Sequence, residues 1–187
     1  MAAQRAELAN LVATANNVAS EAKSVFGNLS VAQLNWKPSS DRWSVGQCFA
    51  HLISSNQGYF PVIENVLAGK KPTFWESLPV LPGLMGKILI KSLDPASTRK
   101  VKAPKKFQPA QSDISGSVIN DFVAQQAQIV EKMQATEHLD LKRTIVTSPI
   151  AAAITYSLMD AYRIIVVHEQ RHFQQAKRVM EESAFPK

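Results

Sequence analysis

Two histidines near the end of the chain, His168 and His172, have the spacing of a helical metal site. Side chains four residues apart lie one above the other on one face of a helix, so both imidazoles can reach the same ion. Ile165 and Ala176 continue this face with apolar side chains, which predicts that both rings face the core. A shared divalent cation would give both buried rings a partner. The alternative is one hydrogen-bonded core histidine with the other at its edge.

Residues 168–172 read HEQRH, which also matches the zinc-peptidase pattern in which the glutamate activates water. A peptidase needs a third ligand further along the chain, yet only fifteen residues follow His172. A peptidase is therefore the weaker interpretation. Glu169 lies one step off the histidine face, and two interpretations stay open for it. It is either a catalytic base or ligand-supporting residue, or a carboxylate at the surface or paired with a nearby arginine.

The third ligand has to come from upstream, and the candidate is His51. It lies two turns inside a helix with a clear predicted start, where Ser44 can cap the chain and Gln47 can return the bond. Trp43 can pack against Cys48 as the hydrophobic staple of this start. A semi-buried histidine with its hydrogen bonds satisfied is the alternative for His51 taken alone.

Three further residues are candidates for lining a pocket beside these histidines. Cys48 lies one turn before His51, Tyr59 lies two turns after it, and Gln175 continues the face of His172. A small buried hydrophobe is the commoner role of such a cysteine, and a core aromatic is the default for the tyrosine. Gln175 could orient a ligand histidine.

Apolar residues at three- and four-residue spacing predict four long helices. They cover residues 5–26, residues 44–67, a stretch from about residue 112, and residues 157–182. Glycine is scarce, convincing alternating strands are absent, and residues 137–156 have no firm periodicity. We therefore expect an all-α four-helix bundle, with residues 1–187 forming one domain.

A proline-rich connector, residues 70–111, separates the second and third predicted helices and contains one short predicted helix at residues 84–92. Connections in bundles are usually short, so this length predicts a crossover that leaves the second and third helices parallel. Phe74 and Trp75 either cover the mouth of a pocket or anchor the connector.

The net charge of +6 is concentrated in the connector, where residues 70–106 hold nine Lys and Arg side chains against Glu76 and Asp94. Because prolines interrupt this segment, a solvated basic surface is the preferred interpretation. Binding of an anionic ligand or of nucleic acid is the minority one.

The composition favours a reducing compartment. Cys48 is the only cysteine, so neither an intramolecular disulfide nor a zinc site with several cysteines can form. Residues 1–17 lack the apolar core of a signal peptide, and the longest apolar stretch, residues 149–167, is interrupted by Asp160 and Arg163. We expect a cytoplasmic protein with no nucleic acid and no membrane as a partner.

Two segments together resemble the DinB-like (YfiT-like) superfamily. In residues 43–52 a Trp-Ser opening leads to a His-Leu pair, as at the start of that family's second helix. Residues 168–175 are similar to its closing motif, His-x-x-x-His with a glutamine three residues on. The resemblance implies an up-down-down-up bundle, often dimeric. It also implies that His51, His168 and His172 hold nickel, zinc or another divalent ion beside water.

Function is implied only broadly. Characterised members of the family resemble metal-dependent transferases that join a low-molecular-weight thiol to an electrophile. We therefore expect a thiol-dependent S-transferase of the detoxification type acting on a small molecule. The alternatives are a metal-dependent hydrolase that uses Glu169, and a non-catalytic bundle that binds a metal or small ligand. We also expect a homodimer, which the apolar stretch Leu78 to Ile90 favours independently.

Overall fold

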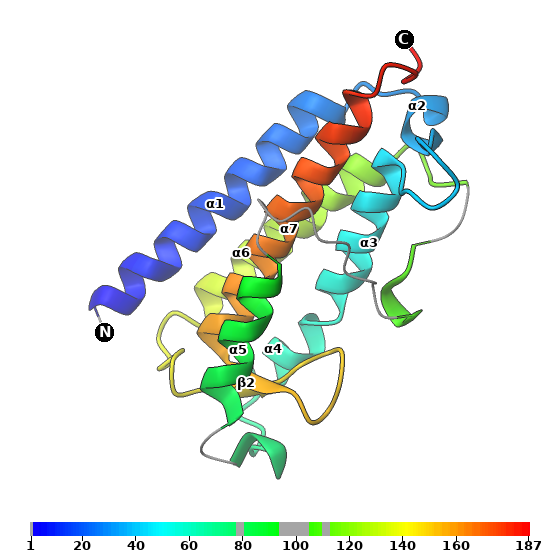
Figure 1. Ribbon diagram of the computed structural model, residues 1–187. Coiled ribbons are helices and arrows are strands. Elements are labelled where there is room, and N and C mark those ends of the chain that lie inside the picture. Colours follow the sequence, from blue (N-terminus) through cyan, green and yellow to red (C-terminus); the bar gives the residue numbers. More distant parts are fainter. Residues whose placement is uncertain (1, 78–80, 94–104, 110–112) are drawn as a thin grey trace.

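The computed structural model describes residues 2–77, 81–93, 105–109 and 113–187. Four long helices pack along one another: α1 (Ala2–Phe26), α3 (Val45–Gln57), α6 (Val118–Ala135) and α7 (Leu158–Met180). α1 and α7 run in one direction while α3 and α6 run in the other (Figure 1). The predicted all-α bundle of up-down-down-up order, with its crossover between the second and third long helices, is confirmed.

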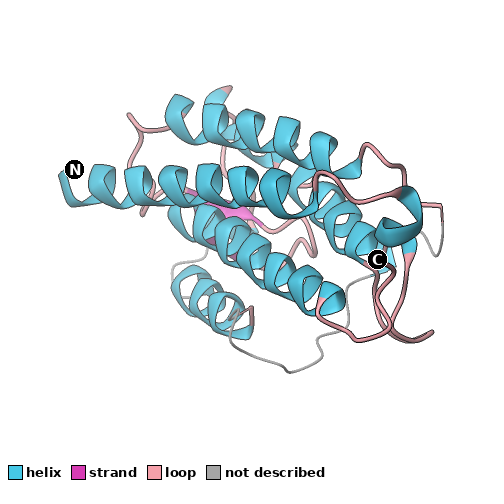
Figure 2. Ribbon diagram, turned by 90° about the horizontal axis from the view of Figure 1, so that it is seen from above, coloured by secondary structure: helices cyan, strands magenta, loops and turns pink. Residues whose placement is uncertain are grey.

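Shorter elements complete the described part of the chain. They are α2 (Val31–Asn35), α4 (Phe60–Leu67), the 3-10 turns η1 (Trp75–Ser77) and η2 (Lys105–Phe107), α5 (Leu81–Ser92), β1 (Ile145–Thr147) and β2 (Thr155–Ser157). α5 lies outside the four long helices (Figure 2). The two strands pair antiparallel just before α7, with Val146 opposite Tyr156. None of the described helices is both long and apolar enough to cross a membrane.

Three expectations about the elements need correction. The predicted helix 44–67 is two helices, because a turn at Gly58 and Tyr59 separates α3 from α4. Pro61, in the first turn of α4, has no amide hydrogen for a continuous helix. The third long helix begins at Val118, whereas residue 112 lies outside the described part. The two three-residue strands were also not expected, since all three residues of β2 are buried and no alternating pattern marks that strand.

Serine caps fix the starts of the two helices that carry the histidines. The Ser44 hydroxyl accepts from the amide of Gln47 at 3.1 Å, and the Gln47 side chain accepts from the amide of Ser44 at 3.1 Å. The Ser157 hydroxyl accepts from the amide of Asp160 at 3.0 Å. The cap predicted at Ser44 is confirmed. A cap of this kind stabilises a helix by about 1 kcal/mol.

Two hydrophobic clusters fill the space between the helices. In one of them four phenylalanines from α1, α3, α6 and α7 meet edge to face, with ring centres 5.1 to 5.3 Å apart. They are Phe26, Phe49, Phe122 and Phe173. This cluster fixes the distance between α3 and α7 next to the histidines, since Phe173 directly follows His172.

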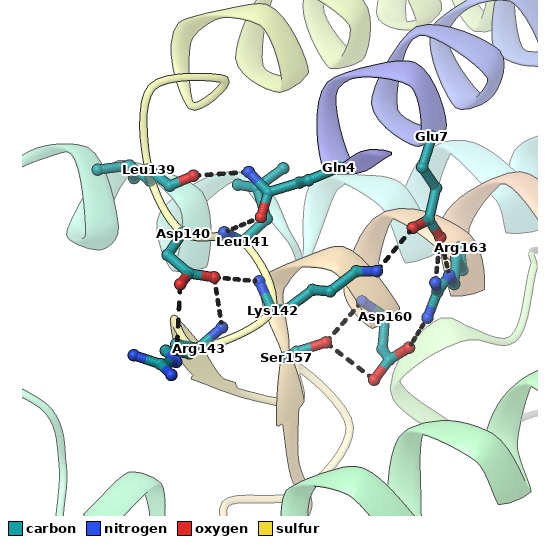
Figure 3. A network of polar contacts seen from close by, with 10 residues as sticks. All are labelled: Gln4, Glu7, Leu139, Asp140, Leu141, Lys142, Arg143, Ser157, Asp160 and Arg163. Carbon is teal, nitrogen blue, oxygen red and sulfur yellow. Dashed lines mark hydrogen bonds and ion pairs between the residues drawn. The ribbon is translucent and has the colours of Figure 1, made fainter. Parts of the chain in front are cut away.

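A polar network joins the start of α1 to the loop after α6 and to the start of α7 (Figure 3). Glu7 accepts hydrogen bonds from Arg163, and its other oxygen lies 3.3 Å from Nζ of Lys142. The side-chain amide of Gln4 donates to the carbonyl oxygen of Leu139 and accepts from the backbone amide of Leu141. These contacts hold the first turns of α1 against α7.

The charge on Glu7 makes this network sensitive to pH. Burial raises the pKa of Glu7, but the hydrogen bonds and charges of Arg163 and Lys142 outweigh it and hold the pKa below its ordinary value of 4.5. Such a carboxylate stabilises the fold at pH above its unfolded pKa and loses this effect as pH falls through its folded pKa. We expect Glu7→Gln to lower the free energy of unfolding by about 1 kcal/mol at neutral pH.

Urea denaturation at a series of pH values measures this difference, which should disappear in acid. Glu21→Gln, at an exposed position on the same helix, is the control. A destabilisation by Glu7→Gln that stays the same at acid pH would contradict the role of the charge.

Candidate metal centre

The three candidate histidines converge between α3 and α7, which run antiparallel (Figure 1). Nε2 of His51 is 3.1 Å from Nε2 of His168. The three ring centres, including that of His172, lie 4.6 to 4.9 Å from one another. One ring nitrogen of each lies within 4.8 Å of the others, a grouping that could hold a metal ion. The structure thus brings the pair on α7 and the upstream histidine together.

A backbone carbonyl fixes the tautomer of His51. Its Nδ1 is 2.6 Å from the carbonyl oxygen of Phe107. A carbonyl can only accept, so Nδ1 of His51 carries the proton and donates it. The lone pair of the neutral ring is then on Nε2, the atom that faces His168. Ligand histidines commonly have this supporting hydrogen bond on the nitrogen opposite the metal.

The other two rings also have nitrogens in need of a partner. Nδ1 of His172 is buried and has no hydrogen-bond partner among the described residues. A buried unpaired group of this kind costs about 1–3 kcal/mol. Nε2 of His51 already carries a lone pair, so only His168 can supply a proton to the short contact between the two rings. A cation bound to one nitrogen of each ring would accept three lone pairs, and the donor set therefore fits a divalent ion with nitrogen ligands.

Burial keeps the three imidazoles uncharged. It lowers the pKa of His51, and the carbonyl of Phe107 only partly offsets this. Burial also lowers the pKa of His168 to about 3, helped by the charges of His51 and Arg171. The pKa of His172 is lowered well below its ordinary value by burial and then by the electrostatic effects of His168, His51 and Arg171. The neutral ring, which has one nitrogen without a proton, is the form that binds metals. At neutral pH few protons therefore compete with a metal for these nitrogens.

Trp43 covers two of the three histidines. Its ring stacks on that of His172 with centres 5.5 Å apart and planes at 23°, and it lies tilted against His51 at 4.9 Å. Trp43 was predicted only to pack at the start of α3, and its contact with the histidines was missed. The sequence did contain one signal for this contact. Trp43 directly precedes Ser44, the cap of the helix that carries His51, and therefore lies at the start of that helix, about two turns before the histidine.

Phe107 was missed as well. Its side chain is buried, and it belongs to η2 in the connector, where only Phe74 and Trp75 were considered as residues near a pocket. The contact uses a carbonyl group, which every residue has, so no residue type could reveal it. The one local signal is an aromatic side chain among polar and charged neighbours. Through this residue the crossover reaches the candidate site.

The interpretation of Glu169 as a surface carboxylate is wrong. The residue is fully buried. Its Oε1 accepts from Nδ2 of Asn56 at 2.8 Å and from Nε2 of Gln126 at 2.7 Å. Burial raises the pKa of Glu169 to about 7, although these two hydrogen bonds act in the opposite direction. Helices pack on more than one side of α7, so a residue one step off the histidine face still points into the bundle.

The three candidate pocket residues take different positions. Cys48 is fully buried in a hydrophobic cluster, where burial raises the pKa of its thiol to about 12. The hydroxyl of Tyr59 lies 2.9 Å from that of Tyr156, and both side chains are buried. Both residues therefore have the core roles that were their default interpretation. Gln175 hydrogen-bonds His172 and raises the pKa of its ring, against the effect of burial.

An up-down-down-up helical bundle with three histidines grouped between α3 and α7 defines a class of helical proteins that can hold a metal ion. A family model described as the DinB superfamily matches residues 3–176, and the chain belongs to this superfamily. The resemblance found in the two sequence segments is thereby confirmed. Neither the curated proteins nor the solved structures gave a match.

The shared acceptor at Glu169 leads to a stability prediction. Glu169→Ala leaves the amides of Asn56 and Gln126 buried without an acceptor, so we expect the free energy of unfolding to fall by about 3 kcal/mol. Glu169→Gln keeps an oxygen in the same place, and we expect less than half of that loss. Urea denaturation of metal-free protein gives both values.

Glu181→Ala, at an exposed position just after α7, is the control for this comparison. Equal losses for the alanine and glutamine variants would contradict the role of the acceptor and assign the effect to the charge.

Proposed function

We propose that His51, His168 and His172 bind one divalent ion, nickel or zinc, and that the protein is a metal-dependent enzyme of the thiol-transferase or detoxification type. The observation that supports this most is the convergence of three uncharged rings, one of them with its free nitrogen fixed by the carbonyl of Phe107. Imidazole ligands suit nickel and zinc, whereas magnesium and calcium prefer oxygen.

Three protein ligands would leave the ion at least one open position, where it can stabilise a thiol as thiolate or a water as hydroxide. The residues around it have separate roles. Burial disfavours the positively charged, doubly protonated form of the three rings, and Phe107 holds His51 in the tautomer that can bind. Trp43 covers one side of His51 and His172 and shields them from solvent. The substrates we propose are a low-molecular-weight thiol and an electrophile to which its sulfur is joined.

One observation favours hydrolysis as the second candidate function. Glu169 has a pKa raised to about 7, and a carboxylate that titrates near neutral pH is suited to act as a general base. Its Oε1, however, is engaged by Asn56 and Gln126, which gives the side chain a structural role between helices. We therefore rank hydrolysis below thiol transfer.

Metal content tests the proposed ligands. We expect purified protein to bind about one divalent ion per chain, since three ligands complete one site. His168→Ala should lower this content sharply because it removes a ligand, whereas His138→Ala, at an exposed position, should leave it unchanged. Elemental analysis after removal of loosely bound metal gives the measurement. Equal metal content in the wild type and in a variant with alanine at positions 51, 168 and 172 would contradict the proposal.

The variant Glu169→Gln separates the two reactions. If the metal stabilises a thiolate, no separate base is needed, and we expect this variant to keep its metal and most of its turnover. His172→Ala should lose both. The measurement is metal-dependent consumption of a thiol with a model electrophile, run beside hydrolysis of model esters and amides.

In a hydrolase, loss of the base would slow the reaction by about 10²–10⁴-fold. A Glu169→Gln protein that keeps its metal but loses nearly all activity would thus replace the transferase proposal by hydrolysis. Metal binding with neither activity would instead favour a non-catalytic metal-binding bundle.

A further inference from the structure

The crossover exposes more large apolar side chains than its length would suggest. Of the eight large hydrophobic side chains exposed among the described residues, four lie within residues 74–88. They are Phe74, Trp75, Leu84 and Ile88, with exposed fractions of 73%, 41%, 59% and 51%. Exposed apolar residues that cluster in this way mark an interaction surface more often than scattered ones do.

α5 has two distinct faces. Leu89, Ile90 and Leu93 pack against a core cluster. Gly86 lies so close to Asp160 that a Cβ atom on it would be 2.7 Å from a carboxylate oxygen, so this side of the helix is firmly seated. The opposite side presents Leu84 and Ile88, four residues apart, to solvent.

Lysines flank this exposed apolar pair. Lys87 and Lys91 are exposed and fall on the same side of α5 as the pair, because they too are separated by one helical turn from its members. We call Leu84, Lys87, Ile88 and Lys91 the outer face of α5. It carries two positive charges and no acidic residue.

The exposed aromatic pair lies at the same end of the bundle. η1, which begins at Trp75, packs against β1 and β2, and α5 packs against β2 (Figure 1). Lys70 and Lys71 precede the pair and are exposed. Glu76 is the only acidic residue between residues 68 and 93, and its carboxylate already accepts from the hydroxyl of Thr147 at 2.7 Å. The whole segment is therefore apolar and basic.

Charge decides which partner fits this surface. A second copy docked face to face would bring Lys87 and Lys91 of both chains together without acidic residues on the face to compensate them. Aliphatic and aromatic side chains bordered by lysines instead match a lipid surface, where the apolar groups enter the headgroup boundary and the lysines remain at anionic headgroups. The expectation of no membrane partner rested on the absence of a spanning segment, and attachment to a surface requires none.

We propose that the outer face of α5, together with Phe74 and Trp75, binds the surface of a bilayer that contains anionic phospholipids. This attachment is independent of the metal centre. α5 packs against the first part of α7, and His168 lies ten residues beyond Leu158, about 15 Å further along the helix. The proposed function and the proposed membrane attachment can therefore be tested independently, and the failure of one would not contradict the other.

Co-sedimentation with lipid vesicles tests the proposal on the full chain. We expect the protein to sediment with vesicles that contain one third phosphatidylserine in phosphatidylcholine, and not with phosphatidylcholine alone. Lys87→Glu/Lys91→Glu should weaken binding by about twentyfold or more, since each lysine near such a surface strengthens binding about fivefold. Leu84→Ser/Ile88→Ser should also weaken it. Circular dichroism verifies that these surface variants are folded.

Two controls make the test specific. Lys23→Glu/Arg178→Glu changes the net charge equally at exposed positions near the ends of α1 and α7. This variant should keep binding within about threefold, because α5 packs against the first part of α7, whereas Arg178 lies twenty residues beyond Leu158, and a distant charge is screened. His168→Ala should bind vesicles like the wild type. Equal losses in the first of these controls and in Lys87→Glu/Lys91→Glu would overturn the proposal.

Three further outcomes would also overturn it. Equal binding to both vesicle types would remove the role of anionic lipid. Binding that Leu84→Ser/Ile88→Ser leaves unchanged would mean that the face attracts any polyanion. The third is a wild type that binds no vesicles and is dimeric by light scattering, while Leu84→Ser/Ile88→Ser is monomeric. That result would assign the face to contact between copies of the chain.

Discussion

The burial of three uncharged imidazoles between α3 and α7 is the constraint on which the rest of the site depends. Buried ring nitrogens need partners, and the protein provides only some of them: the Phe107 carbonyl for His51 and the Gln175 side chain for His172. One nitrogen of each ring lies within 4.8 Å of those of the other two. The packing of α3 against α7 has to hold this arrangement, because a histidine that moved by one turn would leave its nitrogens unpaired in a dry environment.

A second polar contact, next to the histidines, defines the same helix positions. Glu169 on α7 binds Asn56 on α3 and Gln126 on α6 through a single oxygen. If α7 slid along α3 by one turn, these bonds and the contact between His51 and His168 would be lost together. Buried polar groups that are satisfied in only one arrangement favour that arrangement over similar ones. The phenylalanine cluster stabilises the packing of the helices, and the polar contacts select their register.

The sequence predicted what depends on local spacing and missed what depends on the surroundings of a helix. His168 and His172 follow from a helical repeat, and the Ser44 cap follows from a four-residue pattern, so both could be read directly. The break after α3 could have been predicted from Pro61, which has no amide hydrogen and therefore belongs in the first turn of a helix and not in its interior. The burial of Glu169 was missed because one apolar face was assumed, while α7 also buries Arg171 on another side. Phe107 lies 56 residues from His51 along the chain, beyond any local pattern.

The hydrogen bond from His51 to Phe107 has a consequence for how the family can vary. The acceptor belongs to the main chain, so a change of residue type at position 107 does not delete it. What has to be inherited is the path of the crossover, and with it the number of residues between α5 and α6. Natural sequences should therefore accept many substitutions in this segment while tolerating few insertions or deletions near η2. A loop without a recognisable sequence pattern can in this way be as important for the orientation of His51 as the helix that carries this histidine.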